Sequence, residues 1–170
     1  MPCRLYWKSP SMRQTDLLRI RKQNVQVDLA LPGSAPREVE VFLPEYGQQP
    51  YRRQHMLELL EESRNFLPAK DRASGLWELF NRDCLLWLRV PHGRLGEDEP
   101  EEELFDFAKK VRVELDQGAA LEGELLYSAP GEETRVADYL NQRERFFSFW
   151  QGENLYFINK AYVLRVVELD

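Results

Sequence analysis

The sequence predicts a mainly β protein with short helices, built as two tandem five-stranded small barrels related by internal duplication. The main observation is that residues 25–90 and 111–168 align with each other over short gaps. At the start of each copy, apolar and polar residues alternate with period two, as in a half-buried strand. Turn residues separate the short apolar runs. A repeat predicts two copies of one fold, and closing each sheet into a barrel would remove its open edges.

The two copies correspond at several positions. The matched residues are Val25, Val27 and Leu29 with Val111, Val113 and Leu115; Leu59-Leu60 with Tyr139-Leu140; Phe66-Leu67 with Phe146-Phe147; Phe80-Asn81-Arg82 with Ile158-Asn159-Lys160; and Leu85-Leu86 with Val163-Leu164. Because the matches extend over both copies, they favour one common backbone path.

Each element of the first copy has an equivalent in the second. In the first copy we expect strands at 25–31 and 39–43, a short helix at 55–62, a strand near 66–67 and a hairpin over 77–90. In the second we expect strands at 111–115 and 121–127, a short helix at 135–141, a strand at 146–150 and a hairpin over 155–167. The helices follow from apolar residues three and four apart, and Gly118 supplies the positive φ of the first turn in the second copy.

Four segments follow from this alignment. Residues 1–22 form a basic N-terminal arm with a short helix, 23–92 the first barrel, 93–109 an acidic linker helix and 110–170 the second barrel. The linker is assigned as a helix through Leu104, Phe107 and Val111, because Pro100 and several acidic residues stand at its start.

Charge and composition narrow the function classes. Residues 1–90 carry 14 Lys and Arg against 11 Asp and Glu, a net charge of +3, and residues 91–170 carry 9 against 18, a net charge of −9. An acidic second half argues against a protein that tracks phosphates. No apolar run is long enough to span a membrane, and no secretory signal is visible at the N-terminus. We expect Cys84 to be a buried, reduced thiol, which favours the cytoplasm.

Two motifs of the second copy carry a family resemblance. Val111-x-Val113-x-Leu115-x-x-Gly118-x-x-Leu121-x-Gly123-x-Leu125 resembles the first motif of the Sm-like family, two strands around a glycine turn, and Ile158-Asn159-Lys160-x-x-Val163-x-x-Val166 is similar to the second. The resemblance implies a small β-barrel. Sm-like proteins that bind RNA share an Asp and an Asn after the second strand, and an Arg-Gly pair. Tyr127-Ser128 and Asn159-Lys160 stand at those places here, which weakens the expectation of RNA binding.

No arrangement of residues predicts catalysis. The chain has two histidines and two cysteines, no metal-ligand spacing, and no glycine-rich phosphate loop. We therefore expect no enzyme activity, no metal and no cofactor. The candidate partner-binding residues are cations and asparagines at equivalent turns or between aromatics, namely Asn81, Arg82, Asn159, Lys160, Arg143 and Arg145. Asn suits a left-handed turn, and Phe147 and Phe149 are assigned to the core.

The sequence therefore favours a non-catalytic protein-interaction or scaffold module, bacterial and cytoplasmic, without integral membrane association. Its sheet edges, exposed aromatics and acidic second half would bind a protein partner. Binding of single-stranded RNA through the turn cations is the main alternative. A third hypothesis is that the protein senses a small ligand bound between the two copies. The sequence is also compatible with an oligomer.

Overall fold

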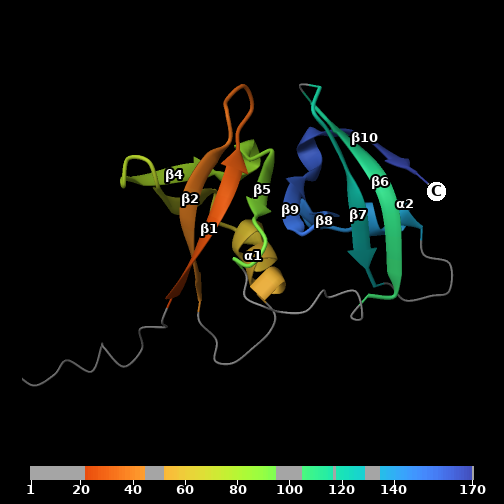
Figure 1. Ribbon diagram of the computed structural model, residues 1–170, viewed down its shortest axis with the longest axis horizontal. Coiled ribbons are helices and arrows are strands. Elements are labelled where there is room, and N and C mark those ends of the chain that lie inside the picture. Colours follow the sequence, from red (N-terminus) through yellow and green to blue (C-terminus); the bar gives the residue numbers. More distant parts are fainter. Residues whose placement is uncertain (1–21, 45–51, 95–104, 117, 129–134, 170) are drawn as a thin grey trace, which may run out of the picture.

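The ten strands that the structure describes lie in one open antiparallel sheet, which runs through both copies of the repeat. The computed structural model describes residues 22–44, 52–94, 105–116, 118–128 and 135–169. The first repeat contains β1 (Lys22–Ala30), β2 (Arg37–Pro44), α1 (Arg52–Glu61), β3 (Phe66–Asp71), β4 (Trp77–Asn81), the 3-10 helix η2 (Arg82–Cys84) and β5 (Trp87–Val90). Figure 1 shows these elements on one side of the molecule.

The second repeat has the same elements in the same order. It contains β6 (Phe107–Leu115), β7 (Ala120–Tyr127), α2 (Val136–Leu140), β8 (Phe146–Gln151), β9 (Asn154–Asn159), the 3-10 helix η4 (Lys160–Tyr162) and β10 (Val163–Glu168). The strand order across the sheet is β10-β6-β7-β8-β9-β5-β1-β2-β3-β4. Within each repeat the last strand therefore lies beside the first, and the next three follow in chain order. The strands and the two short helices predicted from the alternation and spacing are confirmed.

The predicted closure of each repeat into a barrel is not confirmed, because the sheet stays open. A closed first repeat would have needed β5 to pair with β4. The outer edge of β5 instead pairs with β9 of the second repeat, over Trp87 opposite Ile158 to Val90 opposite Leu155. The two repeats thus join through their strands, and β4 and β10 are left as the two ends of the sheet.

Alternation explains why the long strands form. In β1, Val25, Val27 and Leu29 are buried, whereas the polar residues between them are partly exposed. Their equivalents Val111, Val113 and Leu115 in β6 are buried in the same way. A strand with this pattern is stable when one face covers a core and the other meets solvent.

Two glycines of the second repeat are required by the backbone. Gly118, in the turn between β6 and β7, has a φ of 80°, as predicted for that turn. Gly123 in β7 lies under β8, where an added Cβ would stand 2.0 Å from the carbonyl oxygen of Trp150. Glu124, the next residue, pairs with Trp150. Only glycine allows β8 to approach β7 so closely.

Two hydrophobic clusters form the core, one for each repeat, and the first is shared. The first cluster contains buried residues of β1, β2, α1, β3 and β5, together with Phe146, Leu155 and Phe157 of the second repeat. The second is built from β6 to β9 and α2, and it includes Phe147 and Phe149, as predicted. The first repeat therefore has a complete core only in the presence of the second.

Two predictions for other segments are wrong. Residues from Phe107 onward form β6 rather than the end of a linker helix, because they pair with β7 from Phe107 opposite Tyr127. Cys84 is exposed rather than buried, because it ends η2 at a turn outside the core. The predicted N-terminal arm with its short helix, 1–22, lies outside the described residues apart from Lys22, which belongs to β1. Residues 95–104 of the predicted linker helix also lie outside them.

Candidate functional site

The large hydrophobic side chains left in solvent gather at the two ends of the sheet. Six such side chains are exposed among the described residues, and all lie on β3, β4, β10 or the residues beside these strands. We call the first group the β4 edge, made of Phe66, Leu76, Trp77 and Leu79, and the second the β10 edge, made of Leu164 and Leu169. Figure 1 places β4 and β10 on opposite sides of the β5–β9 junction.

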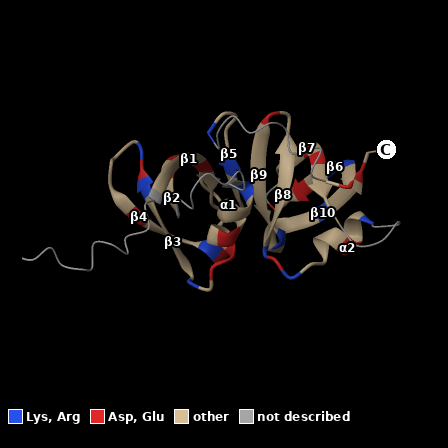
Figure 2. Cartoon of the chain, turned by 90° about the horizontal axis from the view of Figure 1, so that it is seen from below, with Lys and Arg blue, Asp and Glu red and all other residues tan. Residues whose placement is uncertain are grey.

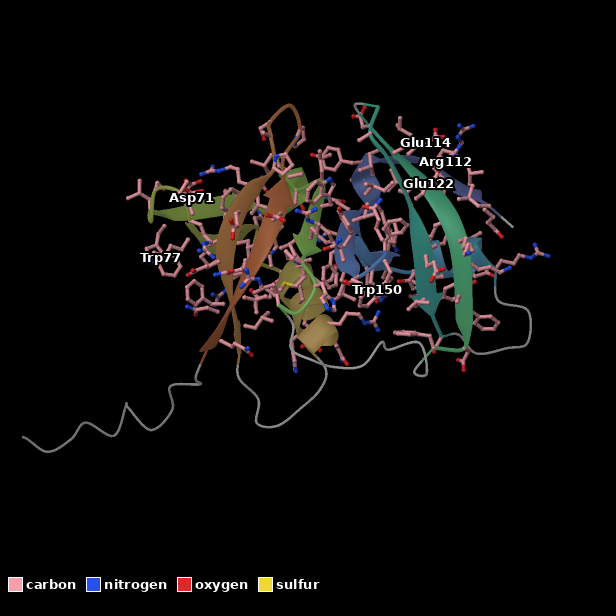
Figure 3. All side chains as sticks on the ribbon, viewed as in Figure 1. Asp71, Trp77, Arg112, Glu114, Glu122 and Trp150 are labelled. Atoms are coloured by element: carbon pink, nitrogen blue, oxygen red, sulfur yellow. The ribbon has the colours of Figure 1, made fainter. Side chains whose placement is uncertain are left out.

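The β4 edge is held in place by aromatic packing and by a bridging arginine. The ring of Trp77 stacks on Phe42 of β2, with centroids 4.9 Å apart, and Figure 3 shows this tryptophan at the outer end of the molecule. Arg37 of β2 binds Glu78 with both terminal nitrogens, at 2.8 and 2.6 Å, and Asp71 at 2.9 Å. The geometry of the edge is therefore set before any partner binds.

The turn that leads into β4 is closed by Asp71. Its carboxylate accepts hydrogen bonds from the Ser74 hydroxyl at 2.7 Å and the Ser74 backbone N–H at 2.8 Å. These bonds, with a smaller contribution from Arg37, lower the pKa of Asp71. The carboxylate is thus charged at neutral pH and fixes the turn that presents Trp77.

Inward of the β10 edge, charged pairs link β10 to β6 and β6 to β7. Arg165 of β10 donates to Glu114 of β6 at 3.1 and 2.7 Å, and this interaction lowers the pKa of Glu114. Arg112 of β6 donates to Glu122 of β7 at 2.7 Å. Figure 3 shows Arg112, Glu114 and Glu122 grouped on the outer side of the second repeat, and Figure 2 marks the charged residues among those that the structure describes.

Arg82, a predicted partner-binding residue, is instead buried. Its side chain is fully enclosed, and desolvation lowers its pKa. Its nitrogens donate to the carbonyl oxygens of Leu59, Arg64 and Phe66 and to the carboxylate of Glu62. The guanidinium therefore ties the loop between α1 and β3 to η2, and it cannot reach a partner. The sequence predicted that Arg82 is an accessible cation at a turn, because no local pattern indicates that backbone carbonyl groups converge on its side chain.

The two repeated asparagines begin the 3-10 helices. The side chain of Asn81 accepts from the backbone N–H of Asp83, and that of Asn159 accepts from Ala161, each at 3.0 Å. Both residues have extended backbones, so the predicted left-handed turn is wrong. Asn159 is buried and also donates to the carbonyl oxygen of Leu85 at 2.9 Å, across the junction. Asn81 has a partly exposed side chain at the β4 edge.

The remaining predicted cations differ in their contacts. Arg145 donates to Asp83 at 2.6 Å and to the carbonyl oxygens of α1 and the residue after it, so it binds the first repeat. The ammonium of Lys160 donates to the carbonyl oxygen of Gln142, and desolvation lowers its pKa. Arg143 is exposed. Arg145 and Lys160 therefore make hydrogen bonds within the chain, and Arg145 makes them across the junction.

The sequence predicted binding through sheet edges, but it did not identify β4 and β10 as the strands that form those edges. One signal was available, because β4 is apolar on both faces: Phe80 enters the core, while Trp77 and Leu79 point the other way. A strand that is apolar on both faces is typical of a sheet interior covered on both sides. At β4 this pattern leaves Trp77 and Leu79 exposed at the end of the sheet.

No protein-family model matches the chain, and neither a curated protein nor a solved structure matches it. Within the described ranges, no three residues among His, Cys, Asp and Glu are placed to hold a metal ion. No helix in that part of the chain is long and apolar enough to cross a membrane.

Proposed function

We propose that the protein is a non-catalytic interaction or scaffold module that binds a protein partner by pairing with the open edges of its sheet. The observation that carries this proposal is the position of the exposed apolar side chains, which lie at the ends of the sheet. Exposed apolar surface beside unpaired backbone groups is the usual basis of strand addition, in which main-chain hydrogen bonds supply affinity and side-chain pockets supply specificity.

The disposition of the cations favours a protein over RNA as the partner. Arg82 is enclosed, and Arg145 binds carbonyls and a carboxylate of its own chain. Phe147 and Phe149, which could have stacked on bases, lie in the core. Stacking and phosphate contacts both need accessible side chains, so these residues offer little to a nucleic acid.

The motif spacings support a finer proposal, that each repeat is an open, Sm-like arrangement of five strands. Gly118 forms the turn between β6 and β7, and Asn159 begins the 3-10 helix before β10, so both motifs fall where strands meet. The free thiol of Cys84 at the surface suits a reducing compartment, and we retain the bacterial cytoplasm as the proposed location.

A pull-down with an edge variant tests the proposed function. Leu79 is exposed, so Leu79→Asp should fold normally while it places a charge on the β4 edge. Arg112→Ala, on the outer side of β6, is the matched control. We expect at least one protein to be retained by the wild type and by Arg112→Ala, and to be reduced about tenfold on Leu79→Asp, equivalent to about 1.4 kcal/mol.

Two outcomes would contradict the proposal. One is retention of the same proteins, in the same amounts, by wild type and Leu79→Asp. The other is material that disappears on nuclease treatment and on raising the salt concentration, because such binding depends on phosphate contacts. The second outcome would favour the RNA alternative.

A further inference from the structure

The strands of the first repeat carry apolar side chains on both faces of their sheet. Alternate side chains of β2, β3 and β4 enter the first cluster, and those between them point to the opposite face. We call this opposite face the outer face, and its apolar members are Phe42, Phe66, Pro68, Trp77 and Leu79. The ring of Trp77 stacks on Phe42. Phe66, Trp77 and Leu79 are 52%, 62% and 69% exposed, so no segment that the structure describes packs over them.

The second repeat shows how an equivalent face is covered. The β8–β9 and β3–β4 hairpins pair in the same register, which makes Phe146, Leu155 and Phe157 the equivalents of Phe66, Trp77 and Leu79. These equivalents are 1%, 2% and 0% exposed, because they enter the first cluster.

The covering segment includes α1, which comes before the second repeat in the chain. Arg53 of α1 donates to the hydroxyl of Ser148 at 2.9 Å, and Glu61 accepts from the backbone N–H of Phe146 at 2.7 Å. In the second repeat, the outer face of this hairpin is therefore covered by the part of the chain that precedes the repeat.

The part of the chain that precedes the first repeat has an apolar run of its own. Residues 1–21 come before the described residues, and they include Leu5-Tyr6-Trp7. Between Trp7 and Leu17 the only large apolar side chain is Met12. An apolar run that is separated from the next by polar residues is stabilised when it packs on apolar surface.

This run is close enough in the chain to reach the outer face. β1 begins at Lys22, and Asn24 lies opposite Phe42, so the chain enters the sheet beside the outer face. The 15 residue steps from Trp7 to Lys22 span up to about 50 Å when extended. In the strand order β1-β2-β3-β4, the first and last strands are only about 15 Å apart.

We propose that residues 5–7 of the chain dock on the outer face of its own first repeat. They would cover Phe66, Trp77 and Leu79 as the first repeat covers their equivalents. The contact is internal, so it does not depend on the proposed function. Where both hold, a partner at the β4 edge competes with the arm, which makes the arm autoinhibitory. Because a docked arm opens locally without unfolding the sheet, its loss should change the Tm little.

Paramagnetic relaxation in the full chain tests the proposal. Cys84 is exposed, so every sample carries Cys84→Ser, and a nitroxide is attached to Cys3, two residues before the proposed contact. We expect the indole N–H of Trp77 and the backbone N–H of Leu79 to lose most of their NMR signal, relative to the reduced nitroxide. Leu164 of β10, on the opposite side of the β5–β9 junction, should keep its signal (Figure 1).

Two variants remove the two sides of the contact. Tyr6→Ser combined with Trp7→Ser removes the apolar side chains of the arm, and Trp77→Ser removes one from the outer face. Met12→Ser is the matched control, because it removes an apolar arm side chain outside the run. Trp77 is exposed, so its replacement should leave the fold intact, which circular dichroism checks. The Leu79 signal should recover in both variants and stay weak in Met12→Ser.

Three results would overturn the proposal. The first is a full signal at Trp77 and Leu79 in the labelled wild type. The second is an equal loss at Leu164, which would mean that the arm has no preferred face. The third is signal loss in an isotope-labelled chain without nitroxide, mixed with a nitroxide-labelled chain, because the docked arm would then belong to another copy.

The pull-down separates this inference from the proposed function. Capture that depends on Leu79, without any relaxation effect, leaves the proposed function and removes the docked arm. A relaxation effect without any captured protein does the reverse. If both are observed, the Tyr6→Ser and Trp7→Ser double variant should retain more of the captured protein than the wild type, and an unchanged amount would contradict competition.

Discussion

Replacing Phe157 by alanine tests whether the two repeats share a core. Phe157 belongs to the second repeat but is fully buried in the first hydrophobic cluster. Removing a buried phenyl ring typically costs about 3–5 kcal/mol, because transfer energy is lost and a cavity remains. For a chain of this length, 1 kcal/mol corresponds to roughly 2–4 °C, so we expect the Tm to fall by about 6–20 °C.

The matched control is Leu79→Ala at the equivalent position of the first repeat. In the single chain Leu79 is exposed, so its truncation should change the free energy of unfolding by no more than about 0.5 kcal/mol. Both variants are unfolded with guanidinium chloride and followed by tryptophan fluorescence, at a concentration where the wild type is monomeric. Equal, small shifts for both variants would refute the shared core, as would a first repeat that unfolds at its usual midpoint in Phe157→Ala.

Three further perturbations follow from the structure. Arg82→Met should lower the free energy of unfolding by more than about 3 kcal/mol in a denaturant titration, because buried carbonyl acceptors lose their donor; an unchanged midpoint would contradict this. Gly123→Ala should destabilise by at least about 2 kcal/mol and speed amide exchange at Trp150, since the added methyl meets its carbonyl; normal exchange there would count against the close approach. Ser74→Ala should raise the pKa of Asp71, measured by NMR titration of the carboxylate. Because the folded-state pKa of Asp71 lies below its ordinary 3.8, its stabilisation is complete above that value and is lost as the pH falls through the folded pKa. The stability difference between wild type and Ser74→Ala should therefore be present at pH 7 and vanish in strong acid, and a difference that persists there would refute the role of the carboxylate.

Local patterns in the sequence were sufficient for the elements but not for their pairing. The alternation through Val25 and Val111 predicted strands, because side-chain period reflects burial on one face. Which edge of β5 is paired depends on contacts with β9, about seventy residues later in the chain, and no local signal encodes that choice. The same reason explains Phe107, whose strand forms by pairing with Tyr127 although its own surroundings resemble a helix start.

In the candidate site, too, the features that depend on local sequence were predicted, whereas those that depend on contacts between distant segments were not. The recurrence of Asn81 and Asn159 was visible in the sequence, and their equivalent positions before 3-10 helices follow from the repeat. The burial of Arg82 was not visible in the sequence, because it depends on carbonyl groups that converge only after α1 and β3 have packed. The exposure of Leu79 also depends on which strand ends the sheet, because the apolar pattern of β4 shows its two faces but not its place in the strand order.

The core shared across the junction also constrains biosynthesis. The amino-terminal half leaves the ribosome before β9 has been translated, and at that stage its cluster still lacks Phe146, Leu155 and Phe157. The nascent half therefore exposes β5 and an open apolar end until nearly the whole chain has emerged. The first cluster is therefore completed only after the β8–β9 hairpin has been translated, and a ribosome that stalls between the repeats leaves a fragment whose exposed apolar surface favours aggregation.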